Sequence, residues 1–121
     1  MSQSDFEAVF VHLKAILVPF ASRFTVTADT DELYSLDTKH LFKNGKPIFF
    51  GAVRRGKAYV SFHLMPVYGQ PDLLDGITPG LKKHMQGKAC FNFRAIDEHL
   101  FKELAKLTKA GIDRYKAAKY V

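Results

Sequence analysis

Hydrophobic positions near the start of the chain recur at helical intervals. They run from Phe6 to Leu17 with a spacing that puts them on one side of a helix, and they stop before Pro19. Ser4 and Glu7 have the spacing of a capping box, which is typical of a helix start. The pattern predicts an amphipathic first helix whose apolar side covers a sheet.

The middle of the chain alternates between apolar and polar residues, as strands do. Strands are predicted over residues 24–28, 33–36 and 47–54. The last of these follows Asn44-Gly45, a strong hairpin signal, because both residues tolerate the positive φ angles of a type I′ turn.

A second turn is expected at Arg55-Gly56, although Arg accepts a positive φ less readily than Asn. A two-residue turn there fixes the register with the following strand. The expected cross-strand pairs are Arg54 with Lys57, Ala52 with Tyr59, Phe50 with Ser61 and Ile48 with His63.

Two predicted strands, over residues 57–64 and 89–94, carry polar side chains at every second position. Each strand therefore has one polar face and one apolar face. The polar side chains are Tyr59, Ser61 and His63 in the first strand, and Cys90, Asn92 and Arg94 in the second. We expect the two polar faces to line one groove.

Helices are predicted on either side of the last strand. Thr78-Pro79 predicts a short helix that continues through Met85, and Asp97 caps a closing helix with an apolar stripe that includes Leu104. Lysines along the other side of the closing helix are interpreted as a solvated face with weak ion pairs, including Glu103 with a lysine three residues on. The expected fold is α+β, an antiparallel sheet of about five strands packed with N-terminal and C-terminal helices and a short helix before the last strand.

Length and composition fit one domain over residues 1–121. The chain is 47% hydrophobic with eleven Phe, which suffices for one core. No basic stretch precedes an apolar run at the N-terminus, and the longest apolar run, Ala15 to Ala21, is broken by a proline, so no membrane partner is expected. The single cysteine, Cys90, is consistent with a reducing compartment, and a cytoplasmic location is expected.

The net charge of +6 is unevenly spread. Residues 1–81 hold eight Lys or Arg and eight Asp or Glu, whereas residues 82–121 hold ten and four. This asymmetry fits an anionic partner, although a basic surface also keeps small domains soluble. Nucleic acid is a second alternative that is not favoured, because no arginine-rich run or aromatic-interleaved basic motif is present.

Several short motifs resemble the YdhG-like family of small bacterial domains of unknown function. They are Gly51-Ala-Val, Lys57-Ala-Tyr-Val-Ser-Phe-His63, Pro66-Val-Tyr68 and Gly87-Lys-Ala-Cys-Phe-Asn-Phe93, and the likeness extends over nearly the whole chain. The resemblance implies an α+β sandwich. One branch of the family is described as a frataxin-like intracellular iron chaperone, so the resemblance also raises iron as an alternative cargo.

The sequence offers little for iron or for catalysis. Iron favours several carboxylate oxygens, and the densest acidic group contains Asp29, Asp31 and Glu32 in a chain of positive net charge. Cys90 and His63 could pair as nucleophile and base if their strands are adjacent, but neither lies in a recognisable catalytic motif. No catalytic activity and no cofactor are expected.

We therefore expect a non-catalytic domain that binds a small or anionic ligand in a groove. The groove should lie between the polar face of the sheet and the segment 65–86. The expected lining residues are Tyr59, Ser61, His63, Tyr68, Lys88, Cys90, Asn92 and Arg94. Among them the two cations can neutralise an anion and the tyrosines can supply flat walls with a polar tip.

Overall fold

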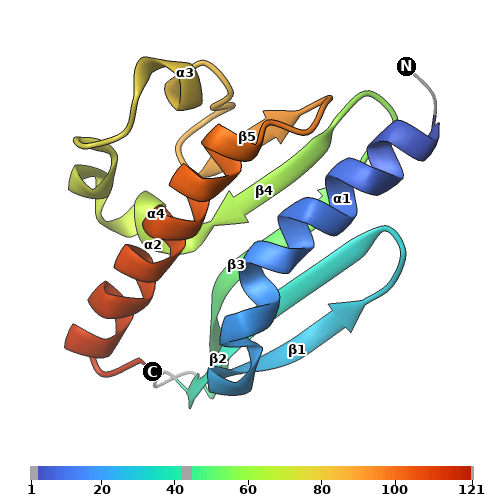
Figure 1. The fold of residues 1–121 in the computed structure, drawn as a ribbon. Coiled ribbons are helices and arrows are strands. Elements are labelled where there is room, and N and C mark those ends of the chain that lie inside the picture. Colours follow the sequence, from blue (N-terminus) through green and yellow to red (C-terminus); the bar gives the residue numbers. More distant parts are fainter. Residues whose placement is uncertain (1–2, 42–44, 121) are drawn as a thin grey trace.

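The computed structural model describes residues 3–41 and 45–120 and has the α+β architecture expected from the sequence. Figure 1 shows the helices α1 and α4 side by side on the same side of the sheet. The helical elements are α1 (Gln3–Leu17), η1 (Val18–Arg23), α2 (Met65–Gly69), η2 (Pro71–Leu74), α3 (Pro79–Lys82) and α4 (Glu98–Ala117), where η denotes a 3₁₀ helix. The strands are β1 (Phe24–Asp29), β2 (Leu33–Leu41), β3 (Pro47–Arg55), β4 (Val60–Leu64) and β5 (Cys90–Phe93).

Within the described residues, five strands form one antiparallel sheet in the order in which they occur along the chain. Because side chains alternate across a strand, each strand turns one set toward the helices and the other away from them. The helix-facing set in the middle of the sheet includes Val53, Phe62 and Phe91, all fully buried. The opposite set includes Ser61 and Asn92, which are half-buried, and it lines the polar face of the sheet.

Aromatic contacts attach α4 to the edge strand β5 and to the middle strand β3. Phe93 of β5 meets Phe101 of α4 edge to face, with ring centroids 4.9 Å apart. In the middle strand, Phe50 of β3 stacks on Phe24 of β1 and meets the edge of Tyr115 of α4. Buried aromatic pairs of this kind contribute about 0.5–1.5 kcal/mol beyond their burial. Both amphipathic helices therefore cover the sheet as their apolar stripes predict.

Several element bounds differ from the sequence prediction. β2 continues to Leu41, and residues 65–69, which carry no helical periodicity, form α2. The short helix begins behind the expected cap, with Thr78 accepting a hydrogen bond from Leu81 N, but it ends at Lys82. Met85, which the prediction placed in that helix, forms an isolated bridge with Phe91 of β5.

The predicted register between β3 and β4 is wrong by four residues. Arg54 lies opposite Ser61 and Ala52 opposite His63, because the connecting turn is centred on Lys57-Ala58 and closed by a hydrogen bond from Gly56 N to the carbonyl of the residue after Ala58. None of the described residues of this turn has a positive φ, so the type I′ argument did not apply. Since four is even, every side chain keeps its face.

Two predicted turn and cap features fall partly outside the described residues. Asn44 is not described, whereas Gly45 has φ +77°, the left-handed conformation that the hairpin signal requires. The side chain of Ser4 also lies outside the described part. At the other end of the chain Asp97 accepts a hydrogen bond from Leu100 N and is the N-cap of α4, as predicted.

In the stretches 3–41 and 45–120, no helix combines the length and the apolar character that crossing a membrane requires.

A carboxylate on α4 fastens the segment before β5. Glu103 accepts hydrogen bonds from the backbone N and the hydroxyl of Thr78, both at 2.7 Å. This contact replaces the ion pair with Lys106 that the sequence spacing predicts, because the carboxylate lies at the start of α3. It joins residues that are 25 positions apart in the chain.

Replacing Glu103 with Ala is expected to lower the free energy of unfolding by about 1–2 kcal/mol, because two charge-assisted hydrogen bonds are lost. Urea unfolding followed by circular dichroism measures this loss. The matched control is Lys109→Ala, which removes an exposed charge from the same helix. Equal effects of the two substitutions would contradict a specific role for Glu103.

Candidate functional site

The pairing of β4 with β5 brings the two predicted polar strands together. Ser61 lies opposite Asn92 and His63 opposite Cys90, all four on the face that α1 and α4 leave uncovered. The Ser61 hydroxyl donates a hydrogen bond to Asn92 Oδ1 at 2.7 Å. Since Oδ1 accepts this bond, the two hydrogens on Asn92 Nδ2 remain available as donors.

Cys90 and His63 are in direct contact, with Sγ and Nδ1 2.8 Å apart. Burial lowers the pKa of His63, and the nearby charge of Arg54 lowers it further. Burial also raises the pKa of the Cys90 thiol. Both shifts favour the neutral forms at pH 7, so the thiol S–H donates to Nδ1. A nucleophilic cysteine requires the opposite arrangement, a thiolate stabilised by an imidazolium, so this pair is not activated.

A first hollow of about 460 Å³ lies beside the turn between β3 and β4. It is lined by Arg54, Gly56, Lys57, Ala58, Tyr59, Ser61 and His63. Two of its residues are cationic, and it contains no acid among the described residues. A polar floor with cations at its rim can accept an anionic group.

A second hollow of about 520 Å³ lies at the outer edge of β5. Its lining includes Tyr59 again, the 83–86 segment, Asn92 and the residues that lead into α4 (Arg94, Ala95, Ile96 and Asp97). His84 stacks on Phe93 with ring centroids 4.4 Å apart, and its Nδ1 lies 2.8 Å from the carbonyl oxygen of Asn92. Because a carbonyl only accepts, Nδ1 carries the hydrogen in this contact.

The structure brings together most, but not all, of the predicted lining residues. Tyr59, Ser61 and His63 line the first hollow, and Asn92 and Arg94 line the second. Cys90 lines neither of these two hollows, but it is in contact with His63, which lines the first. Tyr68 lines a separate hollow with Tyr115 and Tyr120, and Lys88 lies over the ring of Tyr68, with Nζ 5.8 Å from its centroid.

Only part of the segment 65–86 lies where the predicted groove requires it. Val67 and Leu81 are buried in the core on the helix side of the sheet, and Pro66 packs closely on Gly111 of α4. The contact of Pro66 holds α2 against α4, and α3 also contacts α4. Of that segment only residues 83–86 line a hollow beside the polar face.

Several lining residues of the two hollows are absent from the sequence prediction, and the basic ones among them are Arg54, Lys57, Lys83 and His84. Arg54 was assigned to the wrong cross-strand neighbour, and the correct turn position would have placed it beside Ser61. Lys83 and His84 follow a four-residue helix in a segment without periodicity. No local signal in the sequence indicates on which side of the sheet Lys83 and His84 lie.

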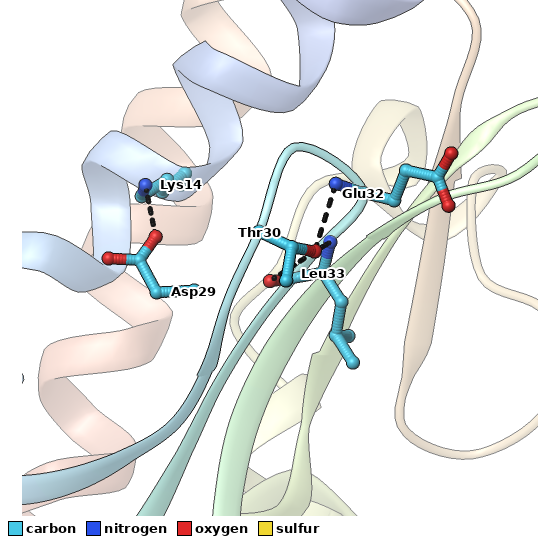
Figure 2. Close-up of polar contacts among 5 residues, drawn as sticks. All are labelled: Lys14, Asp29, Thr30, Glu32 and Leu33. Carbon is cyan, nitrogen blue, oxygen red and sulfur yellow. Dashed lines mark hydrogen bonds and ion pairs between the residues drawn. The ribbon is translucent and has the colours of Figure 1, made fainter.

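The acidic group that iron would require does not form a cluster. Figure 2 shows Asp29 paired with Lys14 of α1, with Nζ and Oδ1 2.7 Å apart, and the carboxylate of Glu32 pointing away from Asp29. Thr30 makes the turn between them, accepting from the backbone N of Glu32 and of Leu33. Among the described residues no three His, Cys, Asp or Glu side chains are grouped as metal ligands would be. The iron alternative receives no support from this geometry.

Comparisons of the chain with protein-family models, with curated proteins and with solved structures each give no match. The resemblance to the YdhG-like family therefore stays a prediction from the motifs alone.

The rate at which iodoacetamide alkylates Cys90 in the folded protein is expected to keep rising with pH through pH 9, because burial raises the pKa of the thiol above its ordinary value of 9.0. Mass spectrometry of samples quenched at each pH measures the rate. The same chain unfolded in urea is the control, and its rate should level off at a lower pH. A plateau below pH 7 in the folded protein would instead identify an activated thiolate.

The free energy of unfolding is expected to fall as pH is lowered from 6.5 toward the pKa of His63 in the folded protein. Over this interval the unfolded chain binds a proton at His63 and the folded chain does not, so protonation favours unfolding. Urea unfolding at pH 7 and at pH 5 should show a smaller fall for His63→Gln than for the native chain. His99→Gln, at an exposed position on α4, is the control and should keep the native pH dependence.

Proposed function

We propose that this protein is a non-catalytic domain that binds a small anionic ligand on the polar face of its sheet. The observation that carries the proposal is the charge of the two hollows. Among their described lining residues, four are cationic and one is acidic. The cations are Arg54, Lys57, Lys83 and Arg94, and all four are exposed.

The carboxylate of the one acid, Asp97, already caps α4. Its Oδ1 accepts a hydrogen bond from Leu100 N at 3.0 Å, at the N-terminus of α4. An N-cap carboxylate interacts with the positive end of the helix dipole, so it opposes an anion in the second hollow less than an unpaired carboxylate would. In the part of the chain that the structure describes, none of the four cationic side chains forms a hydrogen bond or an ion pair.

Binding without chemistry is supported by the neutral state of the thiol and imidazole. His63 lines the first hollow and is in contact with Cys90, but the shifts in their pKa values oppose the thiolate–imidazolium pair that a nucleophilic cysteine would need. In this proposal the pair acts as an uncharged polar floor. Ser61 and Asn92 add hydrogen-bonding groups to the same floor.

Inorganic phosphate is the probe that tests the proposal. Titration at low ionic strength, followed by ¹⁵N-resolved NMR, should give saturable shifts at β4, β5 and the turn after β3. Arg54→Gln should weaken binding by roughly fivefold or more, because a charge-assisted contact is lost. The same loss of charge in Lys109→Gln, on the helix that covers the other face, should change affinity by less than about twofold.

Equal weakening by the two substitutions would show that phosphate responds only to the net charge of +6. That result would overturn the proposal, as would shifts that do not saturate.

A further inference from the structure

The first and second hollows adjoin each other. Tyr59 lines both of them. Ser61 lines the first and Asn92 the second, and these two side chains are joined by the hydrogen bond of 2.7 Å. The partition between the hollows is therefore the Tyr59 side chain together with this polar pair.

Each hollow has its own pair of cations. Arg54 and Lys57 belong to the first hollow, and Lys83 and Arg94 to the second. A compact anion fills one hollow and leaves the two cations of the other hollow uncompensated. An extended ligand with two charged ends can compensate both pairs at once.

The partition suits the middle of such a ligand. Tyr59 is 37% exposed, so its ring offers a flat surface, and Asn92 Nδ2 retains two donors. We propose that the ligand carries an anionic group at each end, one in each hollow, with an uncharged middle part that crosses Tyr59. This inference rests on the proposed function and specifies the ligand class.

Two linked ends should bind much more tightly than one. Once the first end is bound, the second is held near its hollow at a high effective concentration, provided that the linker can reach across Tyr59. Affinity should therefore depend on the length of the linker. A linker that is too short reaches only one pair of cations, and one that is too long lowers the effective concentration.

The test is a homologous series of alkane-α,ω-bisphosphonates with methylphosphonate as the one-ended reference, titrated calorimetrically. One chain length is expected to bind roughly tenfold or more tightly than methylphosphonate, with weaker binding on both sides of that length. Affinity that does not vary with length would overturn the two-ended site.

Substitutions at the two ends make the test specific. Arg54→Gln and Arg94→Gln should each bring the best bisphosphonate close to the affinity of methylphosphonate, since each disables one end. Lys109→Gln is the matched control on α4 and should keep the preferred length.

The possible failures are distinguishable. If methylphosphonate binds as tightly as every bisphosphonate and only Arg54→Gln weakens it, the anion site stands and the two-ended ligand is wrong. If no phosphonate binds saturably, the proposed function is wrong as well.

Discussion

The antiparallel pairing of β4 with β5 is the contact on which the rest of the site depends. It closes a connection of more than twenty residues, and that closure has an entropic cost. Burial of Phe62, Phe91 and Phe93 against the helices offsets the cost, since each aromatic side chain removes a large apolar area from water. The same pairing sets Ser61 beside Asn92 and His63 beside Cys90 on the opposite face. The pairing of β4 with β5, stabilised by apolar burial on one face, thus positions four polar side chains on the other.

The sequence was sufficient to predict which side chains share a face. Alternation in β4 and β5 depends only on strand geometry, and it survived a register error of four residues because the side-chain period is two. Neighbours across strands were harder to predict. They depend on where the turn lies, and Lys57-Ala58 carries none of the residues that mark a tight hairpin.

Lys83, one of the two cations of the second hollow, could not be predicted from the sequence for a different reason. Lys83 follows a helix of only four residues, and its position is fixed by tertiary contacts of the neighbouring residues. Leu81 is fully buried, and Thr78 is held by Glu103 of α4. Irregular segments of this kind take their course from the surfaces they pack on, so local propensity does not determine it.

The segment before β5 also has a consequence for how anything can be recognised at this end of the sheet. Gln86 N donates to the carbonyl oxygen of Cys90, and Asn92 N donates to the carbonyl oxygen of His84, so the outer backbone groups of β5 are already paired. An exposed strand edge would invite a partner chain to add a strand. Here that mode of recognition is blocked, and a molecule that approaches β5 meets side chains instead of backbone.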